Sequence, residues 1–494
     1  MSGAVVSAIV IGGVLGVVVT RGGPQLALLA LAATLAIALL LRSVWNSYAF
    51  VIGALALLPF AVMPIDVGVR PTLLSLALVT ALASVGAVTL IDRRERLQVG
   101  VPHALVLLLI GVTAFALLLG VGRGYTPQTL HDYVKFVLGI LAFFLTTQLV
   151  RSARDGRRLL LMLLAGAGGA GSIALLLYAG GPDVTHRALA RLIPYGYPGD
   201  RVVRYIEDNP ALAMRAVGTG VDPNSFGGLM MVGFVLAVSQ LLVRHRSVPI
   251  WLTTGVSILT CAAMLLTYSR GAWMGALAGV GLVILLRRPL LVLPAVGLGA
   301  LGLAAGVGSG FVTRLWLGFT LQDPATRLRL AEYRNAWDII QRHPWFGVGF
   351  GDAPTIDLQV GVSSVYLTIA ERAGFIGLLV FVVALGVVGW GGLRSSASSE
   401  HDATTDLALT FTAALAATLT VGLVDHYFFN PQFPHMAALL WIVAGTIVSI
   451  APFPHASDVS RADVSSFQRN QLRRGARRRE SARRRRDLTR TGEP

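Results

Sequence analysis

The amino-acid sequence predicts an all-α polytopic integral membrane protein, because it is too apolar and too poor in charge for a soluble chain. Hydrophobic residues make up 54% of it and charged residues only 13%, whereas soluble domains carry about a quarter charged residues. The mean hydropathy is +0.69. Many apolar runs reach the roughly 20 residues that a helix needs to cross a bilayer. We therefore expect the bilayer to be the solvent of this chain.

Hydropathy and length together predict about 12–14 transmembrane helices. The candidate spans cover residues 4–20, 24–41, 46–63, 72–91, 102–121, 131–150, 158–179, 225–243, 249–267, 272–286, 289–308, 366–393, 405–424 and 435–452. Glycine and alanine are abundant inside these spans, which is typical of closely packed membrane helices. The single cysteine, Cys261, excludes an intramolecular disulfide and a cysteine-cluster metal site.

Arginines occur on alternate connections between the predicted spans. They are found at Arg42, 92–96, 151–158, 244–246, 287–288 and Arg394. Under the positive-inside rule these connections, and with them both termini, are cytoplasmic. Segment 453–494 reads as a disordered, arginine-rich cytoplasmic tail that attracts anionic membrane lipids. The net charge of +16 is therefore attributed to topology, and no nucleic-acid partner is expected.

Two predicted connections are too long to be simple turns. They cover about 180–224 and about 309–365, and both fall on the extracytoplasmic side. Within the second, segment 327–342 has helical hydrophobic periodicity and predicts an amphipathic helix at the outer membrane surface.

The chain is accordingly expected to divide into four parts. These are N-terminal transmembrane helices, a core that includes both long loops, C-terminal transmembrane helices and the tail, over residues 1–179, 180–393, 394–452 and 453–494.

Arg270 stands in a Ser-Arg-Gly-Ala-Trp sequence between two apolar runs, at the outer boundary. The positive-inside rule does not explain an arginine at this position. A side chain that extends to the lipid headgroups is one interpretation. The other is a guanidinium that faces an anionic substrate, since its planar fork of donors matches phosphate oxygens.

A second candidate is the segment 215–227, which begins with Arg215 and contains Asp-Pro-Asn. Asp222 or Asn224 can cap the helix that follows, but capping does not account for Arg215 so near the membrane surface. A solvated loop arginine and a substrate-binding arginine both remain open here.

Two more segments on the predicted extracytoplasmic side contain charged residues. Arg327 and Arg329 open the amphipathic helix, which ends at a glycine-rich turn over 343–351. The glycine spacing there does not fit a dinucleotide-binding fold. Glu371 and Arg372 lie about one turn into an apolar helix, where charge is costly unless paired or facing a cavity. A structural pair and a catalytic carboxylate are both possible for Glu371.

Isolated polar groups also occur near other predicted outer loops. His426 and His435, with Asp425, flank the last one, and His131, Asp132 and Arg123 form another group. Histidines in such places are usually interfacial polar groups, and that is the interpretation adopted for them here.

In chain order, these motifs are Arg-x-x-Gly with Asp-Pro-Asn, Ser-Arg-Gly-Ala-Trp, Arg with His-Pro-x-x-Gly-Val-Gly-x-Gly, and Tyr-Leu with Glu-x-x-Gly-x-x-Gly. Together they resemble the O-antigen ligase and O-antigen polymerase family over roughly 205–390. The resemblance implies a GT-C-like, metal-independent glycosyltransferase without a cofactor. Such enzymes transfer a glycan from a polyprenyl diphosphate donor to an acceptor on the outer face of the membrane.

The resemblance also implies roles for individual residues. Arg215 and Arg270 would bind the donor diphosphate, and Arg329 would match the arginine that opens the helix of the long loop, with Arg327 as a substitute. Glu371 is a candidate catalytic carboxylate. Additional candidates for substrate binding are Asn224, Tyr366, Ser363 and Ser364.

The sequence departs from the family's ligases at one position. Ligases carry a His-Asn pair just before the Tyr-Leu, and the histidine is their proposed general base, whereas this chain has Ser363 and Ser364. A serine is no base at neutral pH without help. Asp352, Asp357 or Glu371 could serve instead, or the acceptor hydroxyl could need little activation. A polymerase-like or diverged member is a further interpretation.

The leading hypothesis is thus a glycan ligase or polymerase of the bacterial cell (plasma) membrane. Its expected partners are a lipid-linked oligosaccharide donor and an envelope glycan or lipid acceptor. The alternative is a transporter or flippase of an anionic lipid or solute, which would use the same arginines without chemistry. A catalytically silent relative that scaffolds envelope assembly is a third possibility.

Overall fold

The computed structural model describes residues 43–63, 70–91, 98–120, 125–294, 296–297, 324–351, 362–397 and 402–451. Nearly all regular structure in these segments is helical, and their one sheet is a two-stranded antiparallel ladder of β1 (Arg204–Tyr205) and β2 (Met214–Arg215). The all-α fold class predicted from the sequence is therefore confirmed.

Eleven helices coincide with predicted spans. They are α2 (Val44–Leu57), α3 (Leu73–Ile91), α4 (Val101–Leu119), α5 (Pro127–Leu149), α6 (Ala153–Ala190), α7 (Pro223–Leu242), α8 (Ile250–Leu266), α9 (Arg270–Arg287), α13 (Val365–Ser396), α14 (Ala403–Val421) and α15 (Pro434–Ile450). The expected spans 4–20 and 24–41, most of 289–308, and the tail 453–494 lie outside the described residues.

Shorter elements occupy the connections. The predicted amphipathic helix is present as α12 (Pro324–Arg342). Single 3₁₀ turns are η1 (Ile193–Tyr195), η2 (Ile206–Asp208), η3 (Gly218–Gly220), η4 (Pro289–Leu291) and η5 (Tyr427–Phe429).

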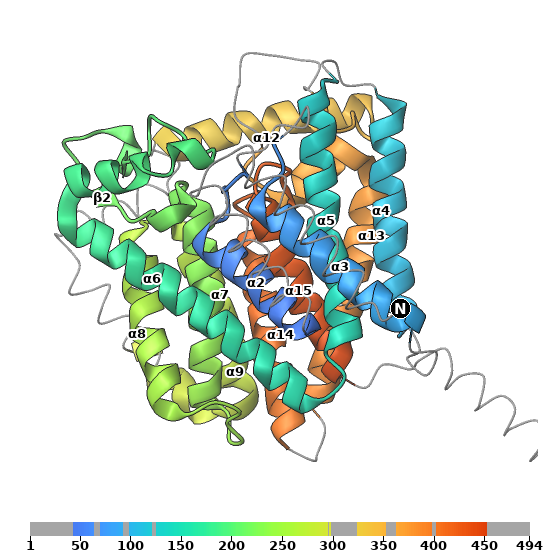
Figure 1. Cartoon of the computed structure of the whole chain (residues 1–494), viewed down its shortest axis with the longest axis vertical. Coiled ribbons are helices and arrows are strands. Elements are labelled where there is room, and N and C mark those ends of the chain that lie inside the picture. The colour runs from blue at the N-terminus through green and yellow to red at the C-terminus, as the bar shows by residue number, and fades with distance from the viewer. Residues whose placement is uncertain are drawn as a thin grey trace, which may run out of the picture.

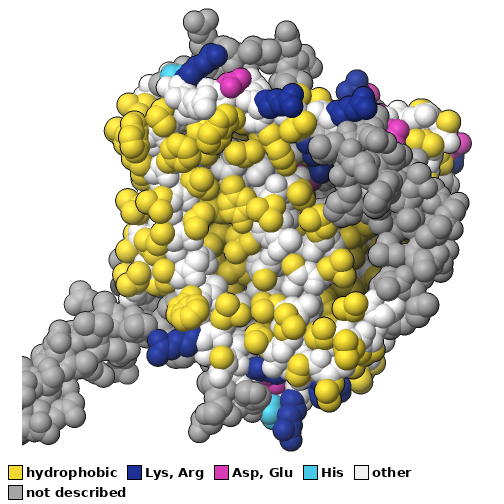
Figure 2. Space-filling model, turned by 180° about the vertical axis from the view of Figure 1, so that it is seen from behind, with side chains coloured by type: hydrophobic (Ala, Val, Ile, Leu, Met, Phe, Trp, Pro, Cys, Tyr) yellow, Lys and Arg dark blue, Asp and Glu magenta, His cyan; other side chains and the backbone are white. Residues whose placement is uncertain are grey.

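The described helices have the length and composition of a multi-pass membrane protein. Seven are long and apolar enough to cross a membrane, and four shorter apolar helices accompany them. Large apolar side chains face outward, among them Leu118 (82% exposed) and Leu277 (75% exposed). Figure 2 shows a broad hydrophobic band with Lys and Arg side chains along its two margins. Such a surface needs lipid around it, because exposing so many apolar side chains to water would be unfavourable.

Close backbone contact between helices depends on glycine. A Cβ on Gly275 would lie 2.8 Å from the carbonyl oxygen of Ala417, and one on Gly279 would lie 2.7 Å from that of Ala413. The spacing of four residues places both glycines on one face of α9. Helix α14 packs against that face, in the small-residue manner typical of membrane helices.

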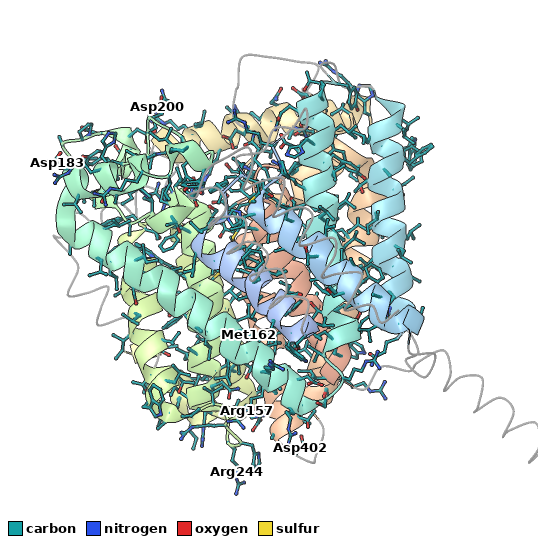
Figure 3. The ribbon with its side chains drawn as sticks, in the orientation of Figure 1. Arg157, Met162, Asp183, Asp200, Arg244 and Asp402 are labelled. Carbon is teal, nitrogen blue, oxygen red and sulfur yellow. The ribbon has the colours of Figure 1, made fainter. Side chains whose placement is uncertain are left out.

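The connections gather at two opposite ends of the molecule. Arg157, Arg244 and Asp402 lie at one, and Asp183 and Asp200 at the other (Figure 3). Helix α12 runs across the second end, crosswise to the upright helices α4, α5 and α13 (Figure 1). We call these the Arg244 end and the α12 end. The two sets of loops are therefore separated as the sequence predicts, while the side of the membrane that each end faces stays a prediction.

Helix α6 extends beyond the predicted span 158–179, as far as Ala190. Its axis breaks at Gly181 (φ +80°, ψ −177°), and Pro182 opens the second part. Glycine tolerates this backbone conformation, and proline is well suited to the first position of a helical segment. The break accounts for the end of the hydrophobic pattern near residue 180, and the non-helical part of the first long loop begins only after Ala190.

A buried carboxylate at the Arg244 end holds several elements together. Asp406 of α14 is fully buried. Arg287 Nε at the end of α9 donates to Asp406 Oδ1 at 2.7 Å, and the backbone N–H of His245 donates to Oδ2 at 2.9 Å. Arg287 Nη1 donates to the carbonyl oxygen of Ser396 at 2.9 Å. Asp406 thereby connects α9, α13, α14 and the α7–α8 connection.

We predict that Asp406→Ala destabilises the protein strongly, because it leaves the guanidinium of Arg287 buried without its carboxylate. Removing one partner of a buried ion pair costs about 3–5 kcal/mol. Asp402→Ala, which removes only an exposed N-cap of the same helix, should cost about 1 kcal/mol. Thermal unfolding in detergent would test this, and equal melting temperatures for the two variants would contradict it.

Candidate active site

Arg215 lies in β2 at the α12 end and bridges two other segments. Its Nε donates to the carbonyl oxygen of Thr267 at 2.7 Å, and its Nη2 donates to Asn224 Oδ1 at 2.7 Å. Thr267 ends α8 only three residues before Arg270. The structure thus brings the predicted residues Arg215 and Asn224 into direct contact, beside the turn that carries Arg270.

The backbone around Arg215 follows from local sequence. Asp222 caps α7, since its Oδ2 accepts from the backbone N–H of Ser225 at 2.7 Å. Gly218 and Val221 have positive φ values of +52° and +58° and turn the chain sharply before the cap. On the other side, the backbone N–H of Ala216 donates to the carbonyl oxygen of Leu266 at 2.8 Å. Both flanks of Arg215 are therefore tied to helix ends.

Arg215 is charged although it is largely shielded from water. Burial lowers the pKa of its guanidinium to about 10, and the carboxylates of Asp222 and Asp425 oppose the decrease. At neutral pH the side chain therefore carries a full positive charge. A shielded cation of this kind attracts an anion more strongly than a solvated one does.

Arg270 is the first residue of α9, and its side chain is half-buried. The turn before it is tight, with Tyr268 at a φ of +54° and the backbone N–H of Ser269 bonded to Thr267 Oγ1 at 3.2 Å. A Cβ on the next residue, Gly271, would lie 3.2 Å from Val424 Cγ2. The α8–α9 turn therefore packs against the α14–α15 connection, which contains Asp425 and His426.

Helix α12 covers this region and contributes Arg329. The pKa values of Tyr333 and Tyr427 are raised, mainly by burial, and the positive charge of Arg329 opposes the increase at both. Arg329 hence lies near both hydroxyl groups and is half-buried, whereas Arg327 is exposed. Of the two arginines, Arg329 is the one whose charge acts on these tyrosines, which lie beside the cluster of Asp222, Glu332, Asp425 and His426.

The two serines that precede α13 are held by the backbone and by α12. The backbone N–H of Ser363 donates to Glu332 Oε2 at 3.1 Å, and its carbonyl oxygen accepts from Tyr333 Oη at 2.9 Å. Ser364 is the N-cap of α13, and its Oγ donates to the carbonyl oxygen of Gly422 at 3.2 Å. Ser364 therefore has a structural function at this helix start.

Tyr366 and Glu371 connect α13 to other segments of the chain. Tyr366 Oη donates to the carbonyl oxygen of Leu419 at 2.9 Å, which joins α13 to α14. Glu371 is buried, and its Oε1 lies 3.9 Å from Arg372 Nε. The backbone N–H of Val348 donates to the carbonyl oxygen of Glu371 at 2.9 Å. Glu371 is thus placed against the glycine-rich turn 343–351, about two helical turns from Ser364.

Close packing of that turn against α13 depends on two glycines. Gly347 and Gly374 have φ values of +66° and +69°. A Cβ on Gly347 would lie 2.3 Å from the carbonyl oxygen of Glu371, and one on Gly374 would lie 2.1 Å from that of Trp345. Gly347 of the turn and Gly374 of α13 are therefore explained by backbone contact.

Three polar residues of the cluster were not assigned to it from the sequence. Glu332 was not singled out, and Asp425 and His426 were interpreted as interfacial groups. Glu332 is 3% exposed and Asp425 is 5% exposed. The sequence does contain one sign that Glu332 belongs to the site, namely a carboxylate on the apolar face of an amphipathic helix. Among the described residues, no group of three or more His, Cys, Asp or Glu side chains could hold a metal ion.

We predict different effects for the two serines before α13. Ser364→Ala removes the N-cap and should lower stability by about 1 kcal/mol. Ser363→Ala should leave stability within about 0.5 kcal/mol, because the bonds of Ser363 described above are made by its backbone. Thermal unfolding of the purified variants measures both, and a larger loss for Ser363→Ala would refute this division.

Comparison with known proteins finds a similar family for the central part of the chain. The family model described as O-antigen ligase matches residues 255–382. No curated protein matches the chain. Among solved structures, a chain in "Structural coordination of polymerization and crosslinking by a peptidoglycan synthase complex" is similar, with 18% identity and a TM-score of 0.38, over 70% of this chain and 96% of that one.

The matched segment runs from α8 to the middle of α13 and includes Arg270, Arg329, Tyr366 and Glu371. It supports a membrane glycan ligase or polymerase in general terms. Residues 255–382 are thus similar to the O-antigen ligase family model, which confirms over this segment the resemblance predicted from the motifs.

Proposed function

We propose that the chain transfers a glycan from a polyprenyl diphosphate donor to an acceptor hydroxyl at the α12 end. The observation that carries the proposal is Arg215, a charged and shielded guanidinium fixed between Thr267 and Asn224. Two of its five N–H groups make these bonds and set the plane of the fork. Fixing the plane prepares the other N–H groups for the oxygens of a diphosphate.

Arg270 and Arg329 would complete the diphosphate site. Arg270 stands at the N-terminus of α9, where the helix dipole favours an anion. Arg329 extends from α12 toward the same cluster, as its effect on Tyr333 and Tyr427 indicates. Asn224 holds Arg215, and Arg327 at the exposed start of α12 would contact more distant parts of the donor. Lipid is expected to enter sideways from the bilayer, with its diphosphate at the membrane boundary.

In the proposed reaction the acceptor oxygen attacks the anomeric carbon of the glycan. The bond from that carbon to the diphosphate breaks, and the polyprenyl diphosphate leaves with the electron pair. Positive side chains that face the leaving group stabilise the charge that develops on it, and removing one such preorganised donor typically costs about 10²–10³ in rate.

The orientation in the membrane completes the proposal. Arg157 and Arg244 lie at the Arg244 end (Figure 3), and Arg288 Nε donates to the carbonyl oxygen of Leu242 beside Arg244 at 3.0 Å. The positive-inside rule assigns this end to the cytoplasm. The α12 end then faces outward, in the bacterial plasma membrane, where envelope acceptors are located. An arginine-rich tail on the cytoplasmic side would contact anionic lipids.

We predict that Arg215→Ala and Arg270→Ala each lower polyprenyl diphosphate release by at least about 10²-fold. Arg270→Lys should also be poor, because an ammonium does not reproduce bidentate contact with phosphate. The substrate would be lipid-linked saccharides extracted from cells that lack this chain, in which its donor accumulates. Purified protein in detergent would be incubated with this extract, and released polyprenyl diphosphate measured by mass spectrometry.

A matched control is Arg187→Ala, since Arg187 lies at the α12 end on the exposed surface of α6. Its activity should equal that of the wild type. Full activity of the Arg215 and Arg270 variants would disprove the site. Transbilayer movement of intact donor in proteoliposomes, with no release of polyprenyl diphosphate, would instead establish the transporter.

A further inference from the structure

The proposed transfer needs a group that takes the proton of the attacking hydroxyl, and the serines before α13 do not supply one. Ser364 Oγ is bonded to the carbonyl oxygen of Gly422, and a serine hydroxyl has no basicity at neutral pH. Glu371 lies about two helical turns away against the glycine-rich turn. The residues that pack on Ser363 and Ser364 are therefore the candidates for this group.

The α14–α15 connection packs directly on this segment. The backbone N–H of Val365 is bonded to the carbonyl oxygens of Gly422 at 2.8 Å and Asp425 at 3.1 Å. Tyr333 Oη, which donates to Ser363 at 2.9 Å, also lies 3.4 Å from the carbonyl oxygen of Leu423. The connection therefore places Asp425 and His426 beside Ser363 and Ser364, although more than 60 residues separate them in sequence.

Asp425 and His426 lie side by side, as a base and its orienting carboxylate must. His426 Nδ1 lies 3.5 Å from Asp425 Oδ1, and the same oxygen accepts from the backbone N–H of His426 at 2.9 Å. The side chain of Asp425 is 7% exposed and that of His426 is 18% exposed. His426 Nδ1 itself is buried, so the exposed fraction of the side chain belongs to its other atoms.

The ring is also held from the side. It packs against the ring of Phe433, with centroids 6.2 Å apart and planes at 77°. A tautomer that carries its proton on Nδ1, the nitrogen 3.5 Å from Asp425 Oδ1, would leave the lone pair of Nε2 as the acceptor. Catalytic contacts are often long before substrate binds and shorten in the complex, which fits the 3.5 Å separation.

The acids of the cluster are engaged in other bonds. Glu332 Oε2 accepts from the backbone N–H of Ser363, and Asp222 Oδ2 accepts from that of Ser225 at 2.7 Å. Tyr333 Oη is bonded to the carbonyl oxygen of Ser363. His426 Nδ1, by contrast, has no formed hydrogen bond to any described residue. Of these titratable groups, His426 is the one whose chemistry is not used to hold the fold.

We propose that His426 is the general base of the transfer and that Asp425 is its positioning residue. This inference rests on the proposed function. The acceptor O–H loses its proton to His426 Nε2 as its oxygen bonds to the anomeric carbon. The electron pair of the broken bond leaves with the diphosphate, and Asp425 stabilises the imidazolium that forms. Proton return to water completes the cycle.

The charges that face His426 set the direction of its pH dependence. Burial lowers the pKa of His426, but the carboxylate of Asp425, followed by Asp222 of the α7 cap and Glu332 of α12, raises it above its ordinary value. Positive charge is near as well, because Arg215 interacts with Asp425 and Arg329 with Tyr427. A base must be neutral, so activity should increase as the pH rises through the raised pKa.

The test compares wild type, His426→Gln and Asp425→Asn for release of polyprenyl diphosphate from pH 5 to pH 9. The substrate is the same extract of lipid-linked saccharides. We expect His426→Gln to lose about 10²-fold or more and to lose the rise with pH, because general-base catalysis contributes about 10²–10⁴-fold. Asp425→Asn should keep partial activity with its pH rise moved to lower pH, since the carboxylate no longer favours the charged imidazole.

Two controls separate a chemical role from a structural one. His131→Gln changes a half-buried histidine at the same end, outside the cluster, and should retain wild-type rate and pH dependence. Binding of polyprenyl diphosphate to His426→Gln should match the wild type, because the arginines that bind it are intact. A His426→Gln protein that binds and still shows the wild-type rate or pH profile would overturn the inference and leave the arginine site standing. No release by the wild type at any pH would instead refute the proposed function.

Discussion

The arrangement of the α12 end depends on the hydrogen bonds of Arg215 to Thr267 and Asn224, which we call the Arg215 clasp. One guanidinium joins β2 to the C-terminus of α8 and to the first turn of α7, through Thr267 and Asn224. A charge so shielded from water would be costly without these acceptors. Because Thr267 belongs to the short turn that leads into α9, the clasp also determines the position of Arg270. The proposed diphosphate site then follows from the way in which the fold satisfies a shielded cation.

Buried charged groups have different hydrogen-bond partners at the two ends of the molecule. At the Arg244 end, both carboxylate oxygens of Asp406 accept hydrogen bonds, from Arg287 Nε and from the backbone N–H of His245, and the result is a structural connection. The α12 end instead gathers Asp222, Glu332 and Asp425 around a histidine ring without a formed bond at Nδ1, and the charge of Arg215 acts on two of these carboxylates. Groups that are incompletely satisfied in a shielded region are candidates for ligand binding and proton transfer.

Fold class and most helices followed from the sequence because hydropathy alone decides them in a membrane. The spans from 46–63 to 272–286 and from 366–393 to 435–452 each contain a helix, and α12 appears where periodicity placed it. The extension of α6 past Gly181 was not predicted, since a glycine followed by proline reads as a helix end. The site was predicted only in part. Motif order indicated Arg215 and Asn224, but residues as distant as Glu332, Ser363 and Asp425 meet only through tertiary packing, which leaves no local pattern.

The central claim is that the arginines of the α12 end hold the donor diphosphate. Its most direct test is a cryo-electron microscopy structure of the protein in lipid nanodiscs, with the lipid-linked donor bound to the His426→Gln variant to prevent turnover. The account predicts diphosphate density in contact with the guanidinium groups of Arg215 and Arg270, beneath α12. Diphosphate bound among the arginines of the Arg244 end, with the Arg215 clasp unoccupied, would contradict it.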